Sequence, residues 1–251
     1  MKYLFTIFLL LSMLNAEETQ KKQKVTIGLG PYIQTQPYKN VDAIFIPSPV
    51  IFFDNSLFYI RWSRAGIYFL GNKGEKFSWG LSVTAQPRTY GYSPDDSLFL
   101  KGMNERESTF EGGLAFSASY EDAYIEMMLL TDVLDRYNSW IFKTEIGDEY
   151  KLGSFSFYPS VIISYQSSDF VNYYYGVTQE EATRTSFSYY KAKDGFQLGA
   201  QTYIKYPITD ELAILANLRA DVLPHSAKKS PLIEKDFILS GLLSLIYTFE
   251  Y

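Results

Sequence analysis

The sequence predicts an all-β fold, namely a transmembrane antiparallel up-and-down β-barrel of 12 strands. Three observations support this prediction. Apolar and polar residues alternate along most of the chain, the connections between the alternating segments are by turns short and long, and the 251 residues include 22 Tyr and 19 Phe. Alternation gives each strand one apolar and one polar face, and short turns at one end with long loops at the other are typical of outer-membrane barrels.

The segment 77–88, FSWGLSVTAQPR, illustrates the alternation, and the segments 109–120, 195–206 and 212–221 repeat it. Their apolar rows carry aromatic residues near the ends, which predicts a lipid-facing band flanked by aromatic girdles. Charged residues on the opposite rows would be costly against lipid but are tolerated in a wet lumen. We therefore expect these residues to face the lumen: Arg61, Glu111, Glu126, Lys143, Glu145, Lys205, Arg219 and Asp221.

The breaks in the alternation fix the predicted strands. Short connections are expected at 54–55, 72–76, 121–122, 148–154 and 207–211, and long ones at 88–108, 131–138, 166–194 and 222–236. The pattern closes if a tight hairpin near Arg64 lies at the long-loop end. The predicted strands are then 24–35, 41–53, 56–63, 65–71, 77–88, 109–120, 122–130, 139–147, 155–165, 195–206, 212–221 and 237–251. Ten strands result instead if 41–71 folds differently.

Both ends of the sequence point to export to the bacterial outer membrane. Residues 1–16, MKYLFTIFLLLSMLNA, combine Lys2, an apolar run and a small residue, as a secretory signal peptide does. Residues 17–251 are then a single barrel domain in the lipid bilayer. At the other end, Tyr247, Phe249 and Tyr251 alternate with polar residues. This stretch resembles the terminal strand by which outer-membrane proteins present themselves for assembly.

Composition limits the chemistry that the chain can perform. The absence of Cys removes disulfides and thiolate chemistry, and a net charge of −5 gives no support to nucleic-acid binding. We predict no catalytic, cofactor or metal site. The one alternative is a hydrolase built on His225, the only histidine, with Ser226 and Asp221 close in sequence. A histidine in an exposed loop explains the same residues.

Several stretches resemble the MipA/OmpV family of outer-membrane proteins. The segments GLGPYIQTQPY (28–38) and IPSPVIFF (46–53) are similar to its first two strands. Two more specific motifs are similar to a Tyr-Tyr-Gly-Val motif and a Ser-Pro motif of the family, and their residues are Tyr174, Tyr175, Gly176, Val177, Ser230 and Pro231. The resemblance runs in order through nearly all of the chain after residue 16.

The resemblance implies a non-enzymatic protein without cofactors. It implies a scaffold that links the outer membrane to a murein hydrolase and a murein synthase in the periplasm. In the predicted topology both specific motifs lie on outward loops, so a scaffold surface would consist of the periplasmic turns and residues 17–24, EETQKKQK. A small diffusion pore and a surface adhesin remain alternatives.

Overall fold

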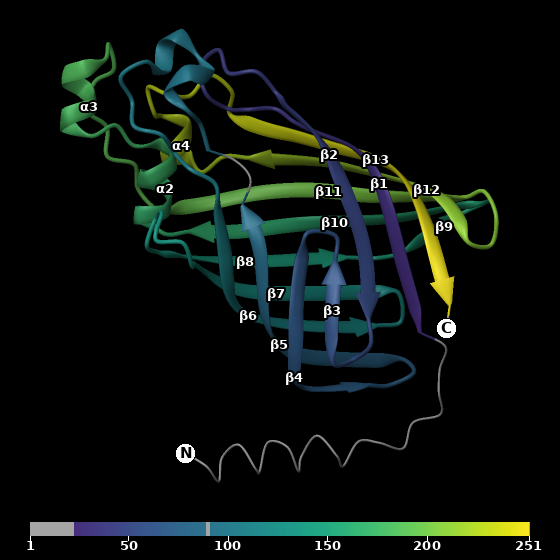
Figure 1. Ribbon diagram of the computed structural model, residues 1–251. Helices are drawn as coiled ribbons and strands as arrows, with labels where there is room; N and C mark the ends of the chain where they lie inside the picture. Colours follow the sequence, from purple (N-terminus) through teal and green to yellow (C-terminus); the bar gives the residue numbers. More distant parts are fainter. Residues whose placement is uncertain (1–22, 89–90, 251) are drawn as a thin grey trace.

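In the computed structural model, residues 23–88 and 91–250 form a closed barrel capped at one end (Figure 1). Apart from β8 and β9, which both pair with β10, each strand pairs antiparallel with its neighbours along the chain, and β1 pairs with β13 to close the wall. The strands are β1 Lys24–Gln34, β2 Ile44–Asp54, β3 Phe58–Arg61, β4 Arg64–Lys73, β5 Phe77–Arg88, β6 Thr109–Tyr120, β7 Ala123–Asp132, β8 Trp140–Gly147, β9 Tyr150–Leu152, β10 Phe155–Gln166, β11 Gly195–Pro207, β12 Leu212–Val222 and β13 Phe237–Glu250.

The wall has 12 strands, as predicted, because β8 and β9 are two parts of one strand. Both pair with β10 in a single register, with Gly147 opposite Ser160 and Tyr150 opposite Phe157. The ladder is interrupted at Pro159, which accepts from the Asp148 backbone N–H at 3.2 Å but has no N–H to donate in return. The predicted turn over 148–154 is therefore wrong. The chain turns only at Gly153, whose φ of +59° suits glycine, and Ser154.

The third strand is shorter than the predicted 56–63. Residues 55–57 form a turn in which the Asn55 side chain accepts from the backbone N–H groups of Leu57 and Phe58, at 3.0 and 2.8 Å. Only Phe58–Arg61 remains as strand. The predicted hairpin near Arg64 is present, because Arg61 pairs with Arg64 across a two-residue tip.

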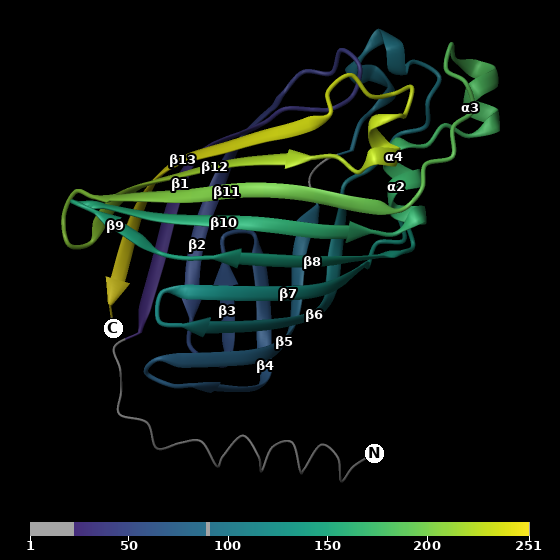
Figure 2. The same cartoon turned by 180° about the vertical axis from the view of Figure 1, so that it is seen from behind.

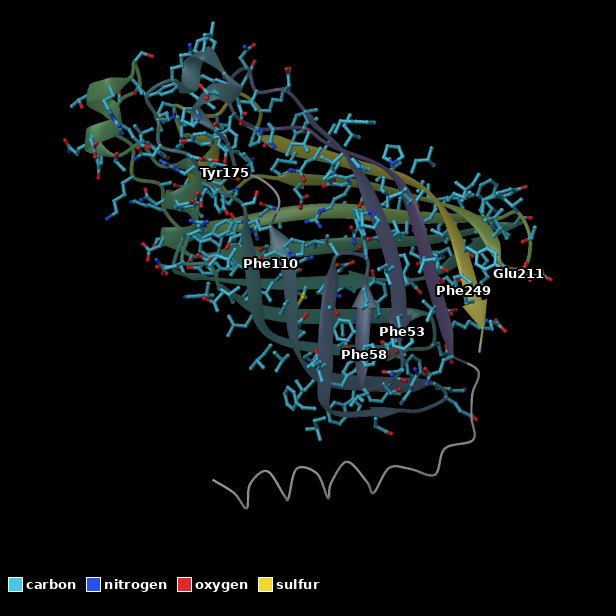
Figure 3. The ribbon with its side chains drawn as sticks, in the orientation of Figure 1. Phe53, Phe58, Phe110, Tyr175, Glu211 and Phe249 are labelled. Carbon is cyan, nitrogen blue, oxygen red and sulfur yellow. The ribbon has the colours of Figure 1, made fainter. Side chains whose placement is uncertain are left out.

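The outside of the barrel is apolar over its whole circumference. Leu29, Ile67 and Leu218 are each about 60% exposed, and their alternate neighbours face inward. In this architecture such side chains contact lipid. Figure 3 shows Phe53, Phe110 and Phe249 on this wall. No helix in residues 23–88 or 91–250 has the length and apolar character needed to cross a membrane.

Of the predicted C-terminal signal, Tyr247 and Phe249 lie on β13, are 41% and 47% exposed, and pack edge to face at 4.7 Å. Tyr251 and the predicted signal peptide, 1–16, lie outside the described residues.

The long connections form a cap over the end opposite the start of β1 and the end of β13 (Figure 2). We call this the loop end and the other the turn end. The 166–194 connection, expected to be a loop, contains α2 Ser168–Tyr175 and α3 Gln179–Arg184. The cap also contains α4 His225–Lys228 and two 3₁₀ turns, η1 Pro94–Asp96 and η2 Leu98–Leu100. Its core of buried side chains includes Tyr38, Leu100, Phe170, Leu223 and Leu232.

Candidate functional site

A cavity of about 1950 Å³ occupies the barrel lumen. It extends from Asn55 and Glu75 at the turn end to Gln166 and Asp221 below the cap. The eight charged residues expected to face the lumen all line this cavity: Arg61, Glu111, Glu126, Lys143, Glu145, Lys205, Arg219 and Asp221.

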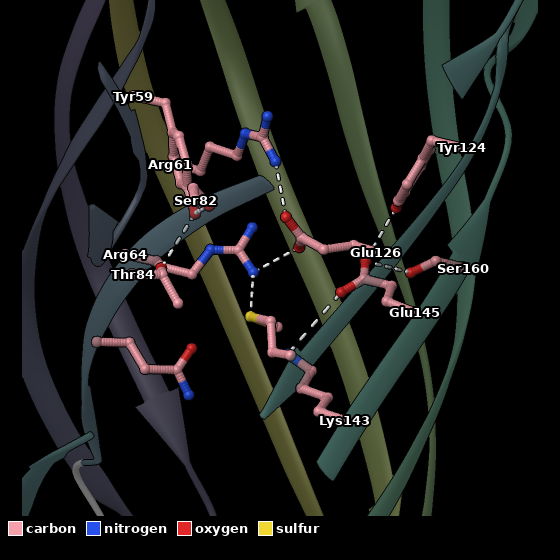
Figure 4. Close-up of polar contacts among 12 residues, drawn as sticks. Tyr59, Arg61, Arg64, Ser82, Thr84, Tyr124, Glu126, Lys143, Glu145 and Ser160 are labelled. Atoms are coloured by element: carbon pink, nitrogen blue, oxygen red, sulfur yellow. Dashed lines mark hydrogen bonds and ion pairs between the residues drawn. The ribbon is translucent and has the colours of Figure 1, made fainter. Parts of the chain in front are cut away.

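Glu126 on β7 binds two arginines of the β3–β4 hairpin (Figure 4). Its carboxylate oxygens lie 2.7 Å from Arg61 Nη1 and 2.5 Å from Arg64 Nη1. Arg61 also contacts Asp54 at 3.1 Å and donates to the Tyr68 hydroxyl at 2.7 Å. These contacts attach the short hairpin to the opposite wall. The sequence analysis assigned Arg61 to the lumen but not Arg64 or Asp54, because it placed both of these at turns between strands.

Glu145 on β8 is held by three neighbouring strands (Figure 4). Its Oε1 accepts from the Tyr124 hydroxyl, the Ser160 hydroxyl and the Gln201 amide, at 2.9, 2.9 and 2.7 Å. Lys143 Nζ lies 3.8 Å from the other carboxylate oxygen. A charge in a largely buried position is tolerated when its hydrogen-bonding capacity is satisfied in this way.

Two further ion pairs lie immediately below the cap. Arg88 pairs with Glu111, which also accepts from the Tyr137 hydroxyl at 3.1 Å. Arg219 donates to both carboxylate oxygens of Asp221, at 2.6 and 2.8 Å. Because the guanidinium of Arg88 lies 4.6 Å from the centre of the Phe170 ring, this layer joins the lumen to α2 of the cap.

Part of the lumen wall is apolar. A cluster of five buried aliphatic side chains lies on β2, β12 and β13, and four aromatic residues pack against it. The lumen therefore combines charged groups with one apolar patch, which we call the apolar wall. The apolar wall consists of Val50, Ala213, Leu215, Leu242 and Ile246 with Tyr32, Phe52, Trp62 and Tyr203.

The motif residues 174–177 lie inside the cap rather than in the lumen. Tyr174 and Tyr175 are fully buried, as Figure 3 illustrates for Tyr175. Gly176 ends α2, and a Cβ there would lie 2.4 Å from the Asn172 carbonyl oxygen. Val177 pairs with Tyr190 in an isolated bridge. The conformation of this motif therefore positions the rest of the cap.

A buried ion pair stabilises the start of α3. Arg106 Nη2 lies 2.8 Å from Glu181 Oε1, and Glu181 also accepts from the backbone N–H groups of Asn104 and Thr178. Burial raises the pKa of Glu181, but these backbone hydrogen bonds and the charge of Arg106 outweigh it, so the pKa lies below the ordinary value.

The second motif, Ser230 and Pro231, lies just before β13. The Ser230 hydroxyl oxygen accepts from the backbone N–H of Leu232, a fully buried member of the cap core, at 3.2 Å. This contact shapes the loop that leads into the last strand.

The residues considered for a hydrolase do not form a triad. His225 is exposed on α4, and the Ser226 hydroxyl oxygen accepts from the Lys193 backbone N–H at 2.6 Å. The Asp221 carboxylate is bound by Arg219 and Gln197 instead. Within the described residues there is no group of three or more His, Cys, Asp or Glu side chains that could hold a metal ion.

The chain is similar to known outer-membrane proteins. A family model described as MltA-interacting protein MipA matches residues 27–249. "MltA-interacting protein" of Escherichia coli (strain K12) is 24% identical over 230 residues, which cover 91% of this chain and 90% of that protein. "Putative outer membrane protein YiaT" of the same organism is 24% identical over 213 residues, covering 85% and 86%.

Solved structures with a similar fold include the COG4313 outer membrane channel from Pseudomonas putida F1. It has a TM-score of 0.45 and 10% sequence identity, and the match covers 94% of this chain and 98% of the channel. The family match covers nearly the whole barrel and includes the 174–177 and 230–231 motifs. The chain thus belongs to the MltA-interacting protein (MipA) family, as a 12-stranded barrel of the bacterial outer membrane.

Proposed function

We propose that the protein is a non-enzymatic scaffold of the cell envelope, which binds a murein hydrolase and a murein synthase through its periplasmic turns. Short turns face the periplasm in barrels of this kind, so the turn end carries the proposed binding surface. A relative with 24% identity is named MltA-interacting protein, which supports a partner of this class.

The observation that carries the proposal is the closed loop end. The cap core fills the mouth above the ion pairs of Arg88 and Arg219 with fully buried side chains such as Phe170 and Tyr174. The lumen cavity is therefore covered at the loop end and extends to residues of the turn end such as Asn55 and Glu75.

The turns at the periplasmic end offer apolar contact points. Leu57, Leu152 and Ile208 lie at three different turns and are 61%, 71% and 51% exposed. The β9–β10 hairpin and the turn between β11 and β12 project beyond the neighbouring turns (Figure 1). Exposed aliphatic side chains on these turns would give a bound enzyme apolar surface to pack against.

Site-specific photocrosslinking tests the scaffold. A photoreactive phenylalanine analogue at Leu152 or Ile208 is expected to form adducts with a lytic transglycosylase or a murein synthase in intact cells. Leu98 in the cap is 77% exposed and gives the matched control, because the same analogue there faces away from the periplasm. Folded barrels that yield no murein-enzyme adduct from either periplasmic position would contradict the scaffold.

A further inference from the structure

The barrel wall has a gap above the β3–β4 hairpin. On one side, residues 44–50 of β2 pair with β1 alone, because β3 pairs with β2 only at residues 52–54. On the other side, β4 pairs with β5 only as far as Ala85, while β5 continues beside β6 to Arg88. In Figure 1 the hairpin ends well short of the ends of β2 and β5. We call the opening bounded by residues 44–50, 62–63 and 86–88 the wall gap.

Prolines remove backbone donors along both sides of the wall gap. The Ile51 carbonyl accepts from Trp62 N–H, so the backbone groups of residues 47 and 49 point the same way, towards the gap. Both of these residues are proline. On β6 the Phe110 carbonyl accepts from the backbone N–H of Val133, the residue after β7. The backbone groups of the next residue, Glu111, therefore point towards β5, and those of its partner Gln86 point towards β6. Pro87 therefore also faces the gap.

The three prolines lower the cost of an open edge within the membrane, because only their carbonyl groups remain to be satisfied. An unpaired N–H group in hydrocarbon carries a large free-energy cost, and proline has none. The prolines also prevent another strand from pairing with this edge, because a β-ladder needs the backbone N–H groups that proline lacks. The edge is therefore suited to remain open rather than to receive a strand.

The lumen cavity reaches the wall gap. Its lining includes Ile46 and Ser48 on one side, Pro87 on the other, and Trp62 and Ser63 at the hairpin tip. Outside the gap, Phe45 is 70% exposed in the lipid-facing row. Inside it, the Trp62 ring packs 5.6 Å from that of Tyr32 and 6.5 Å from that of Tyr203, both on the apolar wall of the lumen.

We propose that an acyl chain enters the lumen through the wall gap from the outer half of the membrane and lies against the apolar wall. Phe45 lies in the lipid-facing row beside the gap, and Trp62 at the hairpin tip packs against the apolar wall that includes Val50 and Leu242. The polar group of the same amphiphile would face the charged groups of the lumen, around Arg64 and Glu126. This inference is independent of the scaffold, because it concerns the lumen and not the periplasmic turns.

Tryptophan quenching by brominated acyl chains tests the proposal. The chain has three Trp, so the Trp79→Phe/Trp140→Phe variant retains Trp62 as its only indole. Reconstituted in dibrominated phosphatidylcholine, this variant is expected to lose fluorescence to an extent comparable with a variant that retains only Trp140, which is 45% exposed on the outer wall. A parallel sample in unbrominated lipid with added dibromostearate distinguishes a membrane lipid from a free fatty acid as the source of the chain.

Two controls separate entry through the gap from other effects. A Tyr124→Trp variant without the three native Trp places the indole in the lumen behind the continuous β6–β8 wall and is expected to remain unquenched. In the Trp62-only background, Ser48→Phe adds bulk at the gap and is expected to reduce quenching strongly. Ser164→Phe adds the same bulk on β10 in the lumen and is expected to have little effect. Ser48→Ala removes the 3.0 Å hydrogen bond from the Trp62 indole without adding bulk, and should preserve quenching.

The outcome for Trp62 decides between an open and a closed wall. Entry of an acyl chain is supported if either brominated lipid quenches the Trp62-only variant and does not quench the Tyr124→Trp variant. A folded Trp62-only variant that neither source quenches overturns the proposal. If Ser48→Phe and Ser164→Phe reduce the quenching of Trp62 equally, entry through the wall gap is overturned. If Ser48→Phe fails to fold, the comparison of Trp62 with Tyr124→Trp still decides.

Discussion

At the scale of single residues, the lumen is organised by carboxylates that each serve several partners. Glu126 is 6% exposed and lies between Arg61 and Arg64, so it connects β7 to the hairpin across the cavity. The inward direction of such residues follows from strand alternation and could be predicted. Their partners could not, because Arg61 and Glu126 are 65 residues apart and meet only when the wall closes.

The first prediction concerns this carboxylate. Glu126→Gln removes the carboxylate that Arg61 and Arg64 share and leaves Asp54 as the counter-charge of Arg61 alone, so it is expected to lower the free energy of unfolding by about 3 kcal/mol. Glu250→Gln removes the exposed pair with Lys24 and is expected to cost about 0.5 kcal/mol or less. Denaturant unfolding in detergent measures both, and equal effects would contradict the role assigned to Glu126.

The second prediction concerns pH. Because the pKa of Glu181 is lower in the folded cap than its ordinary value of 4.5, its stabilising contribution is complete above that value and is lost as the pH falls below it. The protection factors of amide hydrogens around α3, which are corrected for the intrinsic pH dependence of exchange, are therefore expected to fall below about pH 4.5. Glu181→Gln should abolish this dependence, and a wild-type profile without it would be inconsistent with the ion pair to Arg106.

The third prediction concerns Gly176. A methyl group at this position would lie 2.4 Å from the Asn172 carbonyl and side-chain oxygens, so Gly176→Ala is expected to destabilise the cap by about 1–3 kcal/mol. Gly241→Ala is the matched control, since the nearest atom to its added methyl is 3.5 Å away. Limited proteolysis of residues 166–194 measures the difference, and equal rates would indicate that the cap can adjust.

At the scale of elements, the alternation of apolar and polar residues predicts the ends of most strands to within two residues. It does not predict where strand pairing is interrupted or cut short. Strand β3 is short because the Asn55 turn uses residues that alternation assigned to it. The interruption between β8 and β9 depends on Pro159, whose effect appears only once its partner, Asp148, is known. Helices α2 and α3 were not predicted. A capping pair, Thr178 with Glu181, marks the start of α3 and could have indicated it.

At the scale of the whole molecule, the cap divides the lumen from the exterior. Planar bilayer recordings of the intact protein are therefore expected to show no stable conductance. Replacing residues 168–192 with a short Gly-Ser linker removes Phe170 and both helices from the mouth, and is expected to produce conductance. A control linker at 149–152 of the turn end leaves the cap intact and should stay silent. Steady conductance of the intact protein would favour a diffusion pore.

The barrel is closed only when β1 pairs with β13, and we call this pairing the seam. Its two strands come from opposite ends of the chain, as the hydrogen bond between Thr26 and Thr248, 222 positions apart, illustrates. Hairpins such as β6–β7 form from neighbours in sequence, whereas the seam must bring distant segments together at a larger entropic cost. The seam is therefore expected to form last. Until it does, two long unpaired edges face other nascent chains, so faithful folding requires that these edges be shielded during assembly.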